Sequence, residues 1–457
     1  MSVYTRSLER SAFGVVEYIA VLQLLIQVVI GLELTQGIAR YFGGSEDEAE
    51  RRLYASTGFW TLLGAYGAAC AILFVAADRV EALLLGDAAS GILRPAVLSI
   101  YLGIMFYVVR SQLRWELRAT GYAVASVIAV VMTIAVSVYL LLVARIGLVG
   151  VFIGLGAGYG SGTAACLYAL RGTYALSFDV GRLRQMLGFS LPLTVSSLAL
   201  LAASYGDRIV VRTGMGFDDL GVYAAGAKIA SVIALASAGF QLGAAPIIYR
   251  HYRSATMPDA LAQMLRLFFA AGLVGVLTLA AVAIELLAIF TAPAYRDGWR
   301  VIPVLALATV LGSGYIFLPG LSIRAMTAQF AAISIAAGAL SLAAAAGLAQ
   351  AYGIVGAASG VLVGAAAGFL MHGTFSQRVY ALPVDWRRIA AAIVIVLIAI
   401  AATSQFGGAE LEYLLGRIGL CALAAVAVIA IVLDPADRTI VARLLALPLR
   451  SDSRPSP

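Results

Sequence analysis

The sequence predicts an all-α polytopic membrane protein with about 13 transmembrane helices. The first observation is composition: 62% of the 457 residues are hydrophobic, only 12% are charged, and the mean hydropathy is +0.96. Soluble domains carry about 25% charged residues, and a soluble fold of this length could not cover its surface with so few polar groups. Soluble enzymes, nucleic-acid-binding proteins and secreted scaffolds are therefore excluded, and membrane lipid is the expected surrounding medium.

The second observation is the length of the apolar runs. Each run approaches or exceeds the roughly 20 residues that a transmembrane helix requires, and all are far longer than the roughly 9–11 residues of a barrel strand. The predicted spans are 13–41, 56–77, 93–113, 121–144, 147–170, 186–212, 220–249, 264–290, 300–322, 328–349, 353–377, 387–404 and 412–433.

The third observation is the placement of the basic residues, which predicts orientation. The net charge is +7, and the arginines lie singly or in small groups between the apolar runs, as in the loops of a membrane protein. One set of alternate loops holds twenty arginines and the other set ten. The positive-inside rule then places the first set and the C-terminus in the cytoplasm. The three cysteines lie inside apolar runs and predict buried thiols, without a disulfide framework or metal site.

An internal repeat runs through the chain. The segment GLVGVFIGLGAGYGSG at 147–162 matches GIVGAASGVLVGAAAG at 353–368 with an offset of 206, and Arg118-Ala119 falls on Arg324-Ala325 at the same offset. FGVVEYIA, which begins at Phe13, falls on LGVYAAGA, which begins at Leu220, with an offset of 207. Matches so far apart in the chain at nearly one offset indicate two copies of one unit.

The repeat predicts the domain organisation. Because a copy of six spans keeps its orientation, two pseudo-symmetric six-helix lobes would be related by an axis along the membrane normal. The span 186–212 has no counterpart in the first copy, so the sequence resembles a 14-helix architecture that lacks its first helix. The predicted parts are an N-terminal lobe of five spans (1–180), a C-terminal lobe of six spans (181–386), two extra helices (387–433) and a cytoplasmic tail (434–457).

The second copy carries soft apolar motifs that resemble a known family. These motifs are RLRQMLGFSLPLTVSSLALL (182–201), DRIVV from Asp207, LGVYAAGAKIAS (220–231), AYRDGWRVIPVLALA (294–308) and YGIVGAA (352–358). Together they resemble the Wzx-type polysaccharide flippases of the multidrug/oligosaccharidyl-lipid/polysaccharide transporter superfamily. The resemblance covers about 4–432, almost the whole chain.

The resemblance implies two lobes that alternate between cytoplasm-open and periplasm-open states in a bacterial inner membrane. The implied cargo is an undecaprenyl-diphosphate-linked oligosaccharide for O-antigen, capsule or exopolysaccharide, and the implied partners are a polysaccharide polymerase or chain-length regulator. A diphosphate and a sugar chain cannot cross hydrocarbon unaided, because their desolvation costs too much free energy. Such a protein needs a polar, preferably cationic, cavity near the middle of the membrane.

Three residues are candidates for that cavity. Lys228 is the only lysine of the chain and lies well inside the span 220–249, where a lysine costs about 2.5–3.5 kcal/mol. It can meet the diphosphate or sugar as a cavity cation, or form a structural ion pair. Asp207 and Arg208 end the preceding span, and their distances from Gly216 make Asp207 a candidate partner for Lys228. The other interpretation places the Asp207-Arg208 pair at the outer headgroup level.

Further charged residues are candidates for coupling and for the entrance. Glu17 lies one turn inside the first span, where it can serve proton or sodium coupling, as can Asp207, or act as an interfacial carboxylate. No cofactor and no metal are expected beyond such a coupling ion, and no residue set has the spacing of a nucleophile and base or of a P-loop. Four arginines at cytoplasmic ends are either positive-inside anchors or a cytoplasmic mouth that attracts the diphosphate: Arg40, Arg118, Arg250 and Arg324.

Three alternative functions stay open. A cation-coupled drug or metabolite antiporter of the multidrug and toxin extrusion type would have the same fold and would be expected to carry acidic residues deep in a lobe, for which Glu17, Glu33 and Asp207 are candidates. A flippase for the peptidoglycan precursor lipid II would carry more cavity arginines in the first lobe. An O-antigen ligase or polymerase would lack the repeat and carry a large periplasmic loop, whereas the longest outside loop here is about 78–92.

Overall fold

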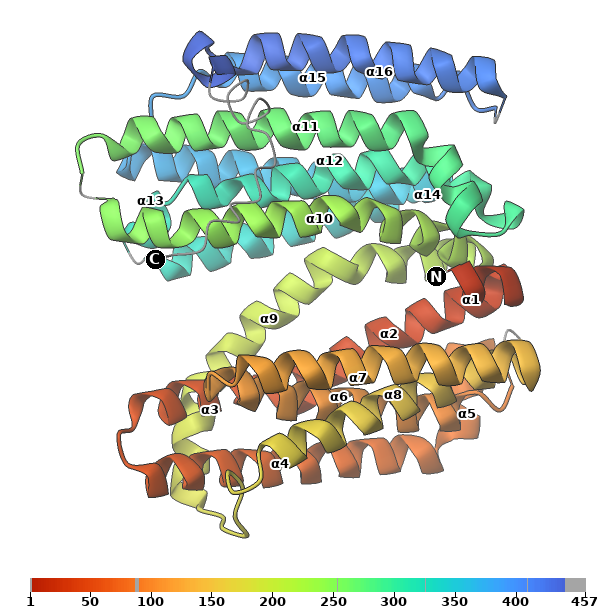
Figure 1. Ribbon diagram of the computed structural model, residues 1–457, viewed down its shortest axis with the longest axis vertical. Helices are drawn as coiled ribbons and strands as arrows, with labels where there is room; N and C mark the ends of the chain where they lie inside the picture. Colours follow the sequence, from red (N-terminus) through yellow and green to blue (C-terminus); the bar gives the residue numbers. More distant parts are fainter. Residues whose placement is uncertain (1, 87–89, 253, 325, 409, 440–457) are drawn as a thin grey trace, which may run out of the picture. The chain divides into compact units, whose positions relative to one another are not determined.

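The structure is a computed structural model that describes residues 2–86, 90–252, 254–324, 326–408 and 410–439. Throughout these residues the secondary structure is helical, without strands (Figure 1). Among the described residues, twelve helical segments are long and apolar enough to cross a membrane. The count is one below the prediction because α14 (Thr327–Val379) contains both predicted spans 328–349 and 353–377. The all-α polytopic fold class is therefore confirmed.

The chain reverses its direction inside α14 at Gly353. This glycine has φ 59° and ψ −141°, a backbone conformation that is essentially restricted to glycine. The two halves of α14 then pack against each other, since a Cβ at Gly360 would lie 2.1 Å from the backbone nitrogen of Ala345 and one at Gly364 would lie 2.3 Å from Cβ of Ser341. Small residues allow two membrane helices to approach this closely, so α14 is a helical hairpin.

The first copy of the repeat packs in the same way. α7 (Ala119–Val138) is followed by a π-helical turn at Tyr139–Val143 and by α8 (Gly147–Ala169), which lies alongside it (Figure 1). Gly147 has φ 59°, like Gly353. The contact glycines Gly154 and Gly158 of α8 face Ser137 and Thr133 of α7, and they precede Gly360 and Gly364 by 206 residues each. The sequence repeat thus corresponds to a repeated helix-packing contact.

The chain divides into two compact units. The first comprises Met1–Ala224 with Phe290–Tyr295, and the second comprises Ala225–Ile289 with Arg296–Pro457. This division follows packing and falls inside α10, whereas the predicted lobes 1–180 and 181–386 follow the repeat. The repeat-based division stays a prediction, and most of the predicted tail 434–457 lies outside the described residues.

The first unit is an all-helical bundle in which α6 packs against α4 and α8, while α9 packs against α2, α3 and α4. Asp47 and Asp179 begin α4 and α9, because each carboxylate accepts a hydrogen bond from a backbone N–H of the first turn. Its remaining helices are α1 (Ser2–Ser7), α2 (Arg10–Gly31), α3 (Leu34–Gly44), α4 (Glu48–Val75), α5 (Ala77–Leu84), α6 (Leu93–Trp115), α9 (Val180–Met215) and the start of α10 (Phe217–His251).

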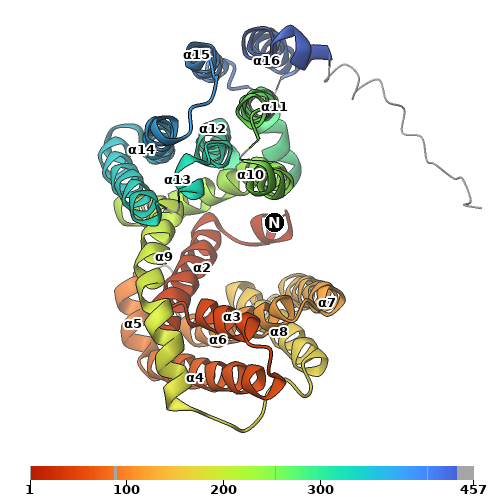
Figure 2. The same ribbon diagram turned by 90° about the vertical axis from the view of Figure 1, so that its left-hand side faces the viewer.

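The second unit contains the rest of α10 and the helices that follow it. α12 packs against α14, and α15 and α16 lie side by side (Figures 1 and 2). α11 contacts α12 where Gly272 approaches the side chain of Val310, and most residues of α12 are buried. Its elements are α11 (Met257–Phe290), a 3₁₀ segment within Pro293–Arg300, α12 (Val301–Ser313), a 3₁₀ turn at Gly314–Phe317, α13 (Gly320–Ile323), α14, α15 (Trp386–Thr403) and α16 (Leu411–Val432).

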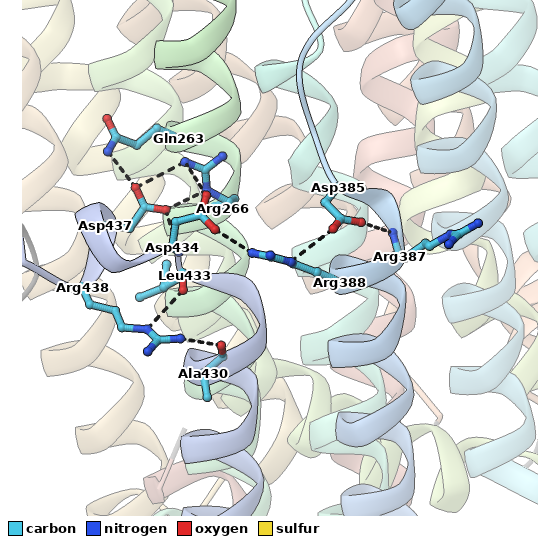
Figure 3. A network of polar contacts seen from close by, with 10 residues as sticks. All are labelled: Gln263, Arg266, Asp385, Arg387, Arg388, Ala430, Leu433, Asp434, Asp437 and Arg438. Carbon is cyan, nitrogen blue, oxygen red and sulfur yellow. Dashed lines mark hydrogen bonds and ion pairs between the residues drawn. The ribbon is translucent and has the colours of Figure 1, made fainter.

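A polar network attaches the end of α16 to α11 (Figure 3). The Asp437 carboxylate, which is fully buried, accepts hydrogen bonds from Gln263 Nε2 and Arg266 Nε, each at 2.7 Å. Asp434 also pairs with Arg388 of α15 at 2.6 Å. Burial raises the pKa of Asp437, but the hydrogen bonds from Arg266 and Gln263 outweigh it and hold that pKa below its usual range. The last two helices are therefore tied to α11 by ionised groups.

Candidate functional site

A buried carboxylate lies between a guanidinium and a phenol in the first unit. Asp207 of α9 is only 4% exposed, and Arg208 Nη1 lies 3.2 Å from its Oδ1. The fully buried Tyr223 of α10 donates a hydrogen bond from its hydroxyl to Asp207 Oδ2. Asp207 precedes the turn at Gly216 by nine residues and Tyr223 follows it by seven, so the helical hairpin brings the two side chains together.

Glu17 of α2 belongs to the same cluster. Its side chain is buried, and its charge acts electrostatically on Arg208. One turn earlier, Gly14 brings α2 very close to the start of α10, since a Cβ there would lie 2.1 Å from the carbonyl oxygen of Phe217. This close approach, which only a glycine permits, positions Glu17 beside the charged pair on α9. We call Glu17, Asp207, Arg208 and Tyr223 the acidic cluster.

The members of the acidic cluster lie at a common depth. At 1.5 Å per residue, Asp207 is about 12 Å from the end of α9 at Met215, Tyr223 is about 9 Å from the start of α10, and Glu17 is about 10 Å from the start of α2. Asp207 is buried, and the alternative that the Asp207-Arg208 pair lies at the outer headgroup level stays a prediction. The cluster thus places two carboxylates and one guanidinium close together in the first unit.

Lys228 is exposed between buried neighbours on its helix. It lies on α10 in the second unit, and its side chain is exposed although Leu220–Ala227 and Ile229–Ala230 are all buried. Its backbone carbonyl accepts a hydrogen bond from Ser231 Oγ at 2.6 Å. Lys228 lies about 16 Å along α10 from the helix start at Phe217. The predicted pair Asp207–Lys228 would join the two units, and it stays a prediction.

The four predicted mouth arginines all lie at the ends of helices or near them. Arg40 of α3 is exposed and stacks over the ring of Phe189 at 4.4 Å. Arg118 precedes α7, pairs with Glu116 at 2.8 Å and donates to the carbonyl of Ala169. Arg250 and Arg324 are exposed at the ends of α10 and α13. Arg118 and Arg324 belong to different units, so their common mouth stays a prediction.

Sequence reasoning missed two parts of this picture. Tyr223 was not singled out, although its spacing from Gly216 mirrors that of Asp207 and is the signal that could have identified it. Arg417 was not singled out either, although it is fully buried in α16 and pairs with Glu285 of α11. Within the described ranges, no three His, Cys, Asp or Glu side chains are grouped to hold a metal ion, and Cys70, Cys166 and Cys421 are free and buried.

Solved structures of transporters share this fold. The chain is similar to "Lipid II flippase MurJ, inward closed conformation", with a TM-score of 0.71, 15% identity, and coverage of 97% of this chain and 95% of that one. It is also similar to an inward-facing multidrug resistance MATE family transporter of the MOP superfamily, with a TM-score of 0.68, 15% identity, and coverage of 85% and 93%. An outward-facing MATE family transporter has a TM-score of 0.58 at 16% identity, with coverage of 85% and 90%.

The comparison of sequences identifies the family. No curated protein matches this chain. The family described as "Polysaccharide biosynthesis protein" matches residues 3–241, which is just over half of the chain. This match includes the acidic cluster and Lys228. The protein therefore belongs to the polysaccharide biosynthesis protein family, in agreement with the Wzx-type flippase resemblance of its motifs.

Proposed function

We propose that this protein is a flippase that moves an undecaprenyl-diphosphate-linked oligosaccharide across the bacterial inner membrane by alternating access. Its family supports a role in polysaccharide biosynthesis, and its fold is shared by a lipid II flippase and by drug transporters. Membrane lipid surrounds the protein, its C-terminus lies in the cytoplasm, and the flipped oligosaccharide is passed to a polymerase or chain-length regulator that builds O-antigen, capsule or exopolysaccharide.

The exposure of Lys228 is the observation that supports a diphosphate cargo best. An exposed lysine about 16 Å into a membrane helix would cost about 2.5–3.5 kcal/mol if it faced hydrocarbon. Ionisable residues at that depth almost always face a water-filled cavity or the interior of a bundle. A cation in a water-lined cavity can replace the water that a diphosphate loses as it leaves the membrane surface, and charge-assisted hydrogen bonds to phosphate are strong.

The acidic cluster supplies the coupling in this proposal. Proton or sodium uptake by Glu17 or Asp207 would make the surroundings of Arg208 less negative. The guanidinium would then lose part of its local compensation, which changes the energy of the α2–α9–α10 contact. A change of charge at this contact shifts the equilibrium between two conformations only if the charged group interacts differently with its surroundings in each of them. Such a bias would link ion uptake to the alternation of the transporter.

The test is polysaccharide export in cells that carry substituted protein, normalised to the amount of protein inserted in the membrane. Lys228→Ala is expected to abolish normalised export, and Lys228→Arg to retain part of it, because the charge survives while the point-charge geometry changes. Val232→Ala is the matched control, since Val232 is exposed one turn further along the same helix and its truncation removes no charge. Normal normalised export by Lys228→Ala would contradict the proposed role of Lys228.

A reconstituted assay separates this function from its alternatives. Vesicles with the purified protein are loaded with a defined undecaprenyl-diphosphate oligosaccharide, with lipid II or with a cationic drug. The proposal expects rapid movement of the oligosaccharide lipid and its loss in Lys228→Ala. Movement of lipid II alone, or exchange of the drug alone, would contradict the proposed substrate and favour the corresponding alternative.

A further inference from the structure

The membrane helices α4 and α11 are counterparts in the internal repeat. Helical geometry is interrupted at Ala76, after α4, with φ −83° and ψ 6°, and inside α11 at Val282, with φ −113° and ψ 16°. Val282 follows Ala76 by 206 residues, which is the offset of the repeat. The end of α11 at Phe290 likewise follows the end of α5 at Leu84 by 206 residues. The two interruptions therefore fix the register in which the faces of α4 and α11 can be compared.

In the second unit, α16 covers one face of α11. Near the start of α11, Arg266 bonds to Asp437, which follows the end of α16, at 2.7 Å. Near the end of α11, Glu285 pairs with Arg417 in the first turns of α16. Helix α16 therefore runs antiparallel along α11 (Figure 2). The residues of the α11 face between these two contacts are only 1–6% exposed: Ala270, Leu277 and Ala281.

In the first unit, the corresponding face of α4 is open. The counterparts of these three α11 residues, 206 positions earlier, are Gly64, Ala71 and Val75. All three are exposed, and Val75 has 84% of its surface exposed. A Cβ at Gly64 would meet no atom within 4 Å. Where the second unit carries a packed helix, α4 therefore presents an uncovered surface.

The start of this α4 face is contacted by the loop that follows α8. Trp60 is the counterpart of Arg266, and its Nε1 donates a hydrogen bond to the carbonyl of Ala175 at 2.8 Å. The backbone N–H of Asp179 donates to Oγ1 of Thr57 at 3.1 Å. The loop thus occupies the position that the residues after α16 occupy in the second unit, and the α4 face is exposed beyond it.

The open face of α4 consists of small residues. Gly64 with Ala68 and Gly67 with Ala71 form two overlapping pairs at a spacing of four residues, and the segment 61–75 holds no charged residue. Pairs of this kind let membrane helices approach each other closely. Glycine inside a helix is otherwise destabilising relative to alanine, and contact with fluid lipid chains does not require it. The composition therefore favours a helix over lipid as the occupant of this face.

The two edges of the open face are complementary to each other. On one edge, an apolar groove of about 320 Å³ lies between α4 and α6, with Gly67 and Phe74 on one wall and Leu98 and Tyr101 on the other. On the opposite edge, about 140° around the helix from Gly67, Ile72 has 69% of its surface exposed. Around a twofold axis parallel to two such helices, the Ile72 edge of one copy lies against the grooved edge of the other, and the reverse. A second copy of this chain therefore matches both edges.

We propose that the α4 face formed by Gly64, Ala68, Ala71 and Val75 is a dimer interface that binds the same face of a second copy of this chain. The two α4 helices run parallel and meet at these small residues, around a twofold axis along the membrane normal. Both copies then have the same orientation in the membrane, and the assembly closes at two copies. The interface lies within the first unit, and the proposal does not depend on the identity of the transported lipid.

The test is energy transfer between donor-labelled and acceptor-labelled copies of the purified full-length protein in liposomes, measured at decreasing ratios of protein to lipid. The wild type is expected to show transfer that saturates as dimers form. Gly64→Leu is expected to weaken the apparent association constant at least tenfold, because the added side chain separates the two helices, while the monomer has open space for it. The matched control is Gly419→Leu, the same change at an exposed glycine of α16 that also faces open space, and it should leave the association unchanged.

Oxidative cysteine crosslinking in native membranes locates the contact. Ala68→Cys is expected to give a disulfide-linked dimer, whereas Val131→Cys, at a residue of α7 with 56% of its surface exposed, and the wild type, whose cysteines are buried, should give none. A wild type that stays monomeric at every ratio of protein to lipid would overturn the proposal and leave the face to lipid or to a helix of a different protein. A dimer that both Gly64→Leu and Ala68→Leu leave intact would also overturn it. Because neither readout involves transport, none of these outcomes bears on the proposed flippase function.

Discussion

The ion pair between Glu285 and Arg417 provides a quantitative test of how the last two helices are held. Arg417 of α16 is 0% exposed, and its Nη2 donates to Oε1 of Glu285 on α11, a carboxylate that is 27% exposed. The second contact of the guanidinium is a long one, from Nη1 to the carbonyl of Phe406 at 3.5 Å. Arg417 Nε and Glu285 Oε2 have no hydrogen-bond partner among the described residues, so the pair is monodentate.

The magnitude follows from this geometry. Glu285→Gln leaves the buried guanidinium of Arg417 without a counter-charge, and breaking a buried pair in this way costs about 3–5 kcal/mol. We expect the lower end, about 3 kcal/mol, because the amide oxygen introduced by Glu285→Gln can still accept a hydrogen bond from the guanidinium. Replacing both residues with apolar ones, Glu285→Leu with Arg417→Met, removes the desolvation of both charges. The double variant is expected to lie within about 1 kcal/mol of the wild type or above it.

The assay is a double-mutant cycle on the free energy of unfolding in bicelles, with the wild type, Glu285→Leu, Arg417→Met and the double variant measured under identical conditions. A favourable coupling of about 2 kcal/mol or more between the two sites is expected. A double variant that loses as much stability as the sum of the single variants would refute the reasoning, because it would show that the two charges do not compensate each other.

Three other perturbations are predicted by the described contacts. Asp437→Asn should destabilise the protein by about 2 kcal/mol at pH 7, because it removes charge-assisted hydrogen bonds. Folding lowers the pKa of Asp437, so this stabilisation is present above the unfolded pKa of about 3.9 and is lost as the pH falls through the lower pKa of the folded state. The difference in Tm between the variant and the wild type should therefore shrink only below about pH 4. A difference that disappears between pH 7 and 5 would contradict this assignment. Gly353→Ala should lower the free energy of unfolding by about 1–3 kcal/mol, because alanine is strained in the backbone conformation of this position. Gly347→Ala is the control on the same hairpin, where open space surrounds the glycine, and it should not destabilise the protein. Equal unfolding midpoints for the two variants would argue against the reversal at Gly353. Tyr223→Phe should lose about 2 kcal/mol, since its hydroxyl bonds to a charged carboxylate, and should lose less in an Asp207→Asn background; an undiminished loss there would show that the phenol acts through another group.

Most of the fold was predictable because lipid imposes simple rules. A chain in hydrocarbon must satisfy its backbone within each segment, so length and hydropathy were enough to predict the spans that became α4, α6 and α8. The two spans on either side of Gly353 were predicted separately and form the two halves of α14. The glycine repeat was readable for the same reason, since closely packed membrane helices need small residues at regular intervals.

The candidate site was only partly predictable, because side-chain partners depend on how helices distant in sequence are packed. Asp207 was singled out from its charge and position, but its contact with Tyr223 required the hairpin turn at Gly216, and its proximity to Glu17 required the close approach of α2 at Gly14. The exposure of Lys228 likewise depends on which face of α10 is covered. Hydropathy measures how apolar a segment is, and it carries no information on how each helix is rotated about its own axis.

Residue type and spacing alone thus determined that this chain is a helical membrane protein with a repeated hairpin, because transfer free energy adds up residue by residue along a segment. Tertiary structure alone decided that Arg417 is buried against Glu285, and that α2 breaks at Leu32 and Glu33. Neither residue at the break is a glycine or a proline, so no local preference marks the position. Contacts between helices near this position, such as the hydrogen bond from Tyr66 to the carbonyl of Gln27, exist only once the bundle has assembled.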